Sequence, residues 1–151
     1  MIIMFCGIPG SGKTTIAELL AARLGDLGRV QLLSSDKLKA PVYRKMLKTL
    51  GPDQKRAEFV ILDATFYKKA WREQVEALAH DEKVITVHLE CALDIALERN
   101  RKRRPNISEK ALHVVFHRME PPDRPTLKID TANLPASDAA AKIFDHVKEQ
   151  R

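Results

Sequence analysis

The segment at residues 7–15, GIPGSGKTT, constrains the fold of this chain more than any other part of the sequence. It has the spacing Gly-x-x-x-x-Gly-Lys-Thr and follows the apolar stretch MIIMFC. Glycines let backbone amides approach an anion without a Cβ in the way, and a helix that begins here adds the amides of its first turn. The segment therefore predicts a strand, a phosphate-binding turn and a helix in direct succession.

Short apolar runs alternate with amphipathic stretches along the rest of the chain. Runs such as FVIL are typical of strands covered on both faces, and strands are expected at residues 2–6, 30–33, 59–62, 84–89 and 127–129. Apolar residues at helical spacing predict helices over residues 13–24, 70–79, 91–100, 108–119 and 137–150. The apolar face of the first helix is expected to comprise Ile16, Leu19, Leu20 and Leu24. This alternation predicts an α/β fold in three layers, with a parallel sheet between helices.

The length and composition suit one domain over residues 1–151. With 44% hydrophobic and 30% charged residues, the chain has the balance of a soluble protein rather than that of a disordered or membrane protein. No apolar run approaches the roughly 20 residues that span a bilayer, and the apolar start is too short for a signal peptide. We therefore expect a cytoplasmic protein in which Cys6 and Cys91 are reduced and buried.

Three side chains near the predicted turn suit the binding of a nucleoside triphosphate. Lys13 is expected to reach the β- and γ-phosphates, and the Thr14 hydroxyl to bind magnesium. Asp63 ends the run FVIL, where a carboxylate can hold the metal through water or orient an acceptor, although it could also cap the next turn. The predicted cofactors are ATP and Mg²⁺. The residues expected to hold the phosphates are Gly7, Pro9, Gly10, Ser11, Gly12, Lys13, Thr14 and Thr15.

The densest charged run, RNRKRR at residues 99–104, lies between two predicted helices. A solvated helix face is the ordinary explanation of such a run. Here it falls where a sheet of this type carries a lid, and guanidinium groups are well suited to spread phosphoryl charge. Arg99 and Arg103 are the residues we expect to act on the donor from that lid.

Asp36 follows the second predicted strand in the sequence LLSSD. The carboxyl ends of parallel strands form the ligand crevice of an open α/β sheet, so Asp36 should face the same crevice as the phosphate-binding turn. A carboxylate there can accept a hydroxyl proton and aim the oxygen at the γ-phosphate. Capping of a helix that begins at Lys37 would require the same residue type, and the two roles are compatible.

The segment behind Asp36 is strongly basic, and Asp53 is its only acid. A solvated surface helix could account for part of this charge, but a surface of one sign beside a catalytic crevice favours a polyanionic acceptor. Aromatic residues are few, so sequence-specific reading of nucleic acid is not indicated. The cations are Lys37, Lys39, Arg44, Lys45, Lys48, Lys55 and Arg56, and the nearest aromatics are Tyr43, Phe66, Tyr67 and Trp71.

Together these motifs resemble a known family over residues 2–122. The ordered set GIPGSGKTT, SSD, LDAT, RNRKR and HRMEPP is similar to that of the small P-loop kinases grouped around polynucleotide 5′-hydroxyl kinase, and to the seryl-tRNA kinase of selenocysteine synthesis. The resemblance implies a three-layer P-loop NTPase fold whose five-stranded parallel sheet has the order 2-3-1-4-5, with a short lid. It also implies that Arg99 or Arg103 touches the ATP phosphates.

The resemblance assigns further roles residue by residue. Asp36 takes the position of the general base, and Asp63 matches the family's D-x-[TN] strand end. Lys39 takes the position of a basic residue that contacts the acceptor phosphate, where the family usually has arginine; lysine supplies the charge but not the bidentate fork. Arg72, which follows LDAT, joins Lys39 and Asp63 as a candidate for acceptor binding.

We therefore predict a kinase that transfers the γ-phosphate of ATP to a hydroxyl of a polynucleotide end or a tRNA-linked acceptor. Seryl-tRNA kinases usually carry a further helical domain for tRNA, so here the kinase domain itself or a partner would hold a tRNA. One alternative is a small-molecule kinase of the adenylylsulfate, gluconate or antibiotic kind. Another is a regulatory ATPase similar to the Elongator-associated relative of seryl-tRNA kinase, which would transfer phosphate to water only.

Overall fold

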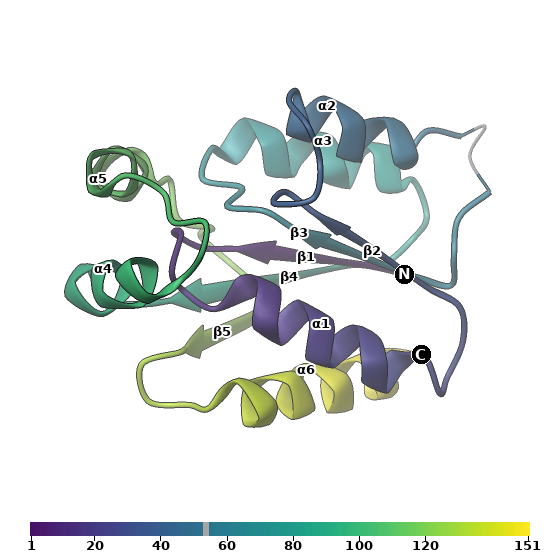
Figure 1. The fold of residues 1–151 in the computed structure, drawn as a ribbon. Coiled ribbons are helices and arrows are strands. Elements are labelled where there is room, and N and C mark those ends of the chain that lie inside the picture. Colours follow the sequence, from purple (N-terminus) through teal and green to yellow (C-terminus); the bar gives the residue numbers. More distant parts are fainter. Residues whose placement is uncertain (53–54) are drawn as a thin grey trace.

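The computed structural model describes residues 1–52 and 55–151, so that Asp53, the acid of the basic segment, lies outside the described residues. Its centre is a parallel sheet with the strand order β2-β3-β1-β4-β5 (Figure 1). The order implied by the resemblance is thereby confirmed. Four strands end one residue later than predicted, each at a polar residue. The strands are β1 (Ile2–Cys6), β2 (Val30–Ser34), β3 (Phe59–Asp63), β4 (Val84–Glu90) and β5 (Leu127–Asp130).

Helices cover both faces of the sheet, which confirms the predicted three layers. Figure 1 shows one pair on each face and a third pair beyond the carboxyl ends of the strands. The first pair is α1 (Lys13–Leu24) and α6 (Ala136–Gln150), and the second is α2 (Val42–Thr49) and α3 (Lys69–Ala79). The third pair is α4 (Leu93–Lys102) and α5 (Glu109–Arg118). No helix among the described residues has the length and apolar character needed to cross a membrane.

Two apolar layers hold the helices to the sheet, and every residue of β1 is buried between them. The predicted apolar face of α1 is wrong at Leu19, which is 38% exposed, whereas Ala17 is fully buried. The helix packs on α6 as well as on the sheet, which turns its buried face toward position 17. Cys6 is buried as expected, but Cys91 at the end of β4 is partly exposed, so that prediction holds for one cysteine only.

Local signals explain where the outer helices begin. Ser108 is the N-cap of α5, and its Oγ accepts a hydrogen bond from the amide of Ala111 at 3.1 Å. Asp36 caps no helix, because the chain turns through residues 35–41 before α2 begins at Val42. The capping alternative for Asp36 is therefore wrong, and its side chain needs another explanation.

Candidate active site

The phosphate-binding turn lies between β1 and α1 and has the backbone that its glycines predict. Gly10 and Gly12 have positive φ angles of 82° and 91°, in the region that side chains disfavour. A Cβ on Gly10 would also lie 2.5 Å from the carbonyl oxygen of Ala96 on α4. Gly12 is the N-cap of α1, so the amides of the first helical turn face the concave side of the loop. Of the remaining predicted phosphate-binding residues, Gly7, Pro9 and Ser11 lie in the same turn, and Thr15 lies in the first turn of α1.

Lys13 is almost completely buried, with 8% of its surface exposed. Its Nζ donates a hydrogen bond to the carbonyl oxygen of Ile8 at 2.8 Å, which folds the side chain across the turn. Burial is the largest influence on this amine and lowers its pKa from 10.5 to about 8, against the opposing attraction of Asp63. Lys13 is thus a desolvated cation placed where phosphate oxygens would replace its lost water.

This position of Lys13 predicts a pH dependence of nucleotide binding. Phosphate favours the charged amine, so the free protein must take up a proton on binding once the pH exceeds the Lys13 pKa of about 8. Between about pH 7 and pH 9, affinity for ADP should fall about tenfold, since a proton is then lost from most free molecules. Calorimetric titration in buffers of different ionisation enthalpy measures both the affinity and the proton uptake. Equal affinities without proton uptake at pH 9 would contradict the assignment.

Asp63 joins the phosphate-binding turn to the ends of β2 and β3. Its Oδ2 accepts hydrogen bonds from the hydroxyls of Thr14 at 2.8 Å and Ser34 at 2.7 Å. Its Oδ1 is buried and has no hydrogen-bond partner among the described residues. A buried carboxylate oxygen of this kind, beside a threonine hydroxyl, fits a Mg²⁺ ion or a water of its coordination shell. The structure thus brings together the two predicted metal-site residues, and Ser34 is an orienting partner that the sequence did not indicate.

A cavity of about 680 Å³ extends from the turn along the carboxyl edge of the sheet. It is large enough for a nucleotide. One wall is the segment at residues 131–136, which follows β5 and which sequence reasoning missed. Its sequence, TANLPA, has no distinctive chemistry, and its position after the last strand was the only available signal. The other lining residues are Gly10, Gly12, Lys13, Thr14, Thr15, Ile16, Asp36, Arg99 and Arg103.

The two predicted lid arginines occupy different positions. Arg99 is held by its neighbours: its guanidinium donates to the carbonyl oxygen of Thr131 at 2.7 Å and to that of Gly10 at 3.4 Å. It therefore braces the phosphate-binding turn against the segment after β5. Arg103 follows α4, and its Nη2 donates to Oδ2 of Asp36 across the cavity at 2.8 Å. Both partners of this ion pair are partly exposed, with side-chain exposures of 36% and 49%.

None of the three predicted acceptor-binding residues, Lys39, Asp63 and Arg72, lines this cavity. Lys39 is exposed in the connection before α2, and its carbonyl oxygen accepts a hydrogen bond from Lys45. Arg72 is 5% exposed, and its guanidinium donates to the carbonyl oxygen of Phe66 at 2.7 Å. Arg72 lies on the buried face of α3, where its Nη1 is 4.0 Å from the Cys6 sulfur. Arg72 therefore has a structural position in the interior instead of the expected position at an acceptor surface.

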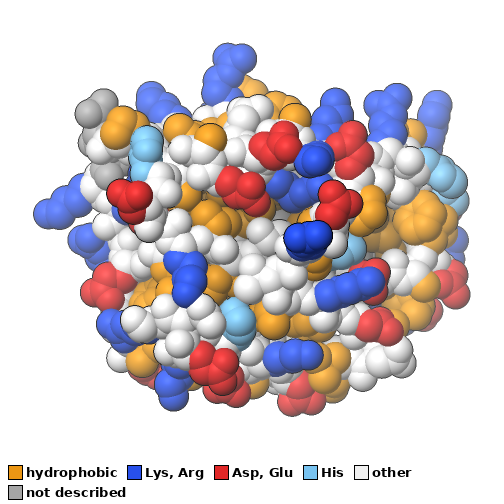
Figure 2. All heavy atoms as spheres, turned by 180° about the vertical axis from the view of Figure 1, so that it is seen from behind, with side chains coloured by type: hydrophobic (Ala, Val, Ile, Leu, Met, Phe, Trp, Pro, Cys, Tyr) orange, Lys and Arg blue, Asp and Glu red, His pale blue; other side chains and the backbone are white. Residues whose placement is uncertain are grey.

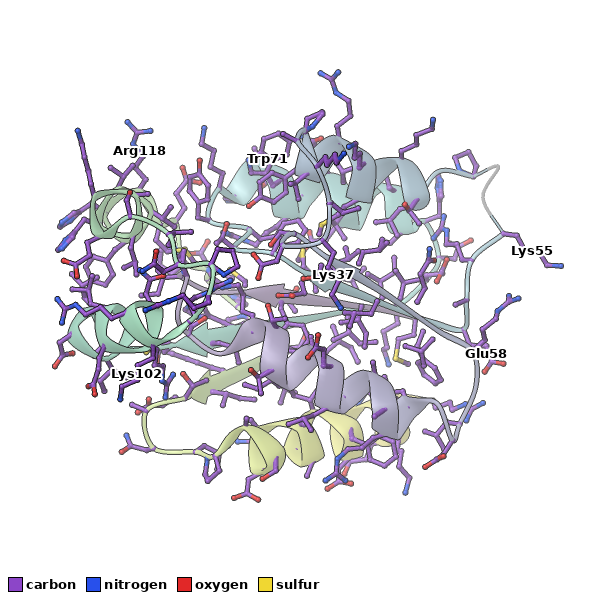
Figure 3. The ribbon with its side chains drawn as sticks, viewed as in Figure 1. Lys37, Lys55, Glu58, Trp71, Lys102 and Arg118 are labelled. Carbon is purple, nitrogen blue, oxygen red and sulfur yellow. The ribbon has the colours of Figure 1, made fainter. Side chains whose placement is uncertain are left out.

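The basic segment forms a less continuous surface than its sequence indicates. Arg56 is half-buried and paired with Glu82, which removes it from the surface. Lys55 lies at the end of the sheet opposite to α4 and α5 (Figure 3). Lys37 is exposed but lies 3.3 Å from Glu18 of α1. On the opposite face, seen in Figure 2, acidic side chains are interspersed among the basic ones. Because Arg56 is paired and Lys55 lies at the far end of the sheet, the positive charge available beside Asp36 is smaller than predicted.

A family model, a curated relative and solved structures match this chain. A family model described as an AAA domain matches residues 2–122. A curated relative, the bifunctional enzyme NodQ of Azospirillum brasilense, is 26% identical over 166 residues. The match covers 95% of this chain and 26% of the relative, so the chain spans about a quarter of that protein's length.

Solved structures share the fold over nearly the whole chain. APE1195 is 24% identical with a TM-score of 0.78 and covers 99% of this chain and 95% of its own. Kti12 of Chaetomium thermophilum, solved with ADP-AlF3, is 22% identical with a TM-score of 0.72 and coverages of 99% and 98%. APS kinase CysC of Mycobacterium tuberculosis, solved with AMPPNP and APS, is 16% identical with a TM-score of 0.70 and coverages of 97% and 96%. The chain therefore shares the fold of these three proteins.

Proposed function

The chain belongs to the AAA-domain family, and on that premise we propose that it is a Mg²⁺- and ATP-dependent kinase with a hydroxyl acceptor. The observation that supports this best is the position of Asp36. Its carboxylate lines the same cavity as the phosphate-binding turn and faces an arginine, yet it caps no helix. A carboxylate at that place suits the activation of an acceptor beside the γ-phosphate.

On the donor side, the turn and the first amides of α1 hold the phosphates, with Lys13 at their β- and γ-oxygens. Thr14 and Asp63 would hold the magnesium ion, which supplies charge neutralisation to the phosphates when bound. Arg99 fixes the wall formed by residues 131–136, so the nucleoside enters a preformed part of the cavity. The donor half of the site is thus arranged for positioning and for stabilisation of charge.

On the acceptor side, the hydroxyl oxygen attacks the γ-phosphorus while its proton passes to the Asp36 carboxylate. The bond from the γ-phosphorus to the bridging oxygen breaks, and ADP leaves with that oxygen. Arg103, which pairs with Asp36 in this structure, would turn to the γ-phosphoryl oxygens when the donor is bound. Because both side chains are partly exposed, little free energy opposes this exchange of partners.

The acceptor we propose is the 5′-hydroxyl end of RNA or DNA, or a tRNA-linked hydroxyl. The exposed lysines at residues 37, 39, 45 and 48, which follow Asp36 in the sequence, support it. A small-molecule acceptor is the second candidate, favoured by the loss of Arg56 and Lys55 from that surface. The likeness to APS kinase and to Kti12 is compatible with either class and with an ATPase.

One experiment separates these candidates. The protein is incubated with γ-labelled ATP and a panel of 5′-hydroxyl RNA and DNA, seryl-tRNA, total tRNA, adenylylsulfate, gluconate and simple sugars. We expect label on a polynucleotide end or on a tRNA-linked acceptor. Label on a small acceptor alone would identify the small-molecule kinase, and free phosphate that increases with tRNA would identify the regulatory ATPase.

A polynucleotide acceptor also predicts a steep salt dependence. A single strand held through three phosphates should bind about 20-fold more weakly when salt rises from about 50 to about 200 mM. The KM of the labelled acceptor, measured at saturating ATP across this range, gives the slope. A flat response would instead support a small, weakly charged substrate, and the KM of ATP serves as the internal reference.

A further inference from the structure

A pair of stacked aromatic rings lies between α2 and α3, on the face of the sheet that these helices cover. The rings of Tyr43 on α2 and Trp71 on α3 have centroids 4.6 Å apart and are nearly parallel, at 15°. Phe66 is fully buried and meets the other side of Tyr43 edge-on, with centroids 5.2 Å apart. Trp71 is partly exposed to solvent and also packs against the core beneath α2 and α3. We call Tyr43 and Trp71 the aromatic platform.

The platform is rigidly connected to the phosphate-binding turn. The amide of Gly7 donates to the carbonyl oxygen of Thr65 at 3.1 Å, and the Thr65 hydroxyl is hydrogen-bonded to the Tyr43 hydroxyl at 2.7 Å. The amide of Phe66 also donates to the Tyr43 hydroxyl, at 3.2 Å. Thr65 itself lies two residues after Asp63 of the candidate metal site. The ring of Tyr43 is thus fixed relative to the place where phosphate would be transferred.

The surroundings of the platform suit a nucleic acid. Figure 3 shows Trp71 at the end of α3 that faces α5, which is the end nearest to the carboxyl edge of the sheet. Lys68 and Lys69 lie three and two residues before it and are exposed, and Lys69 is 3.8 Å from Glu73. An accessible aromatic face beside exposed cations is how proteins bind single-stranded nucleic acid without reading its sequence.

We propose that the aromatic platform stacks against the base of the acceptor's 5′-terminal nucleotide, with Trp71 as the contacting ring. This rests on the proposed function and specifies how that acceptor is held. Stacking would place the terminal sugar by its base, while Asp36 receives the proton of the 5′-hydroxyl. Tyr43 acts through Trp71 as a positioning residue, because its hydroxyl anchors the stack to Thr65.

Trp71 is the only tryptophan of the chain, so its fluorescence reports on the platform alone. With Mg²⁺ and ADP present, a 5′-hydroxyl single strand should quench this fluorescence, with a midpoint close to its KM in transfer. A strand whose terminal nucleotide lacks its base should give no quenching. Quenching that is equal with and without the terminal base would overturn the proposal, as would quenching by adenylylsulfate alone.

Variants of Trp71 and Tyr43 test how much the stacking contributes to binding of the strand. Trp71→Leu should raise the KM of the strand about 5- to 100-fold, the range for one stacked base, without changing kcat or the KM of ATP. Trp71→Phe should bring the KM of the strand most of the way back to that of the unsubstituted protein. Tyr43→Phe should raise this KM less than Trp71→Leu does. Phe144→Leu on α6, in the opposite layer, is the matched control. If Trp71→Leu raised the KM of the base-free strand as much as that of the complete strand, the role of Trp71 would be merely structural.

The platform and the proposed function can fail separately. Strands that are phosphorylated at the normal rate without quenching would overturn the platform and leave the kinase assignment intact. If only small molecules in the panel are phosphorylated, the polynucleotide acceptor is wrong, and the stacking proposal is wrong with it.

Discussion

Replacing Lys13 with methionine is expected to abolish phosphoryl transfer and, in the nucleotide-free protein, to increase the free energy of unfolding. Transfer should fall by at least about 100-fold, because a preorganised charge on the β- and γ-phosphates is removed from a buried site. Stability should rise because the structure holds this amine with a pKa of about 8, compared with 10.5 for an ordinary lysine. At about 1.36 kcal/mol per pKa unit, removal of the charge is expected to stabilise the free protein by about 1–3 kcal/mol.

The stabilisation should depend on pH in a defined direction. The cost of the buried charge is fully present below pH 8 and disappears as the pH rises toward 10.5, where the unfolded chain also loses the proton. Urea unfolding of both proteins at about pH 7 and at about pH 10 tests this, and the difference should be large only at the lower pH. Lys48→Met, at an exposed position on α2, is the control and should leave stability unchanged. A Lys13→Met protein that is less stable at both pH values would contradict the expectation.

The fold could be predicted from the sequence because its signals are local. The GIPGSGKTT turn requires a strand before it and a helix after it, and continuous apolar runs such as FVIL identify strands buried on both faces. Leu19 was wrongly predicted to be buried. Helical spacing groups apolar residues on one face of a helix, but it does not show which other helices and strands cover that face. Contact with α6 decides which side of α1 is buried, and that contact is between segments far apart in the chain.

The placement of the site followed from topology more than from residue type. Parallel strands end at one edge, so Ser34 and Asp63 had to lie close to the turn. Residue type alone misled at Arg72 and Arg56, since a charge pattern does not show which guanidinium finds a carbonyl or carboxylate under a helix. The segment at residues 131–136 was missed for the opposite reason. The segment lines the cavity, but it carries no charged side chain that would distinguish it in the sequence.

Replacing Asp36 with asparagine is the variant that tests the acceptor chemistry. The amide keeps the shape of the side chain but cannot accept the hydroxyl proton, so transfer should fall by about 100-fold or more. Donor binding should change little, because in the proposed site the phosphates are held by the turn and by Lys13, which line the cavity together with Asp36. Stability should also change little: the Arg103–Asp36 pair is partly exposed, and such pairs contribute about 0–1 kcal/mol. Single-turnover transfer and calorimetric ADP binding measure the two effects independently.

The changes in transfer and in ADP binding in the Asp36→Asn protein together identify the role of Asp36. Loss of transfer with intact ADP binding supports the general base, and equal loss of both would make the residue structural. Asp26→Asn, in the exposed turn after α1, controls for the removal of one negative charge.

Release of free phosphate is the third readout, because water can react without a positioned acceptor. If Asp36→Asn abolishes transfer to the labelled acceptor but spares this hydrolysis, the carboxylate serves the acceptor and not the donor. Equal loss of hydrolysis and transfer, with ADP binding intact, would show that Asp36 activates water as well, as the regulatory ATPase requires.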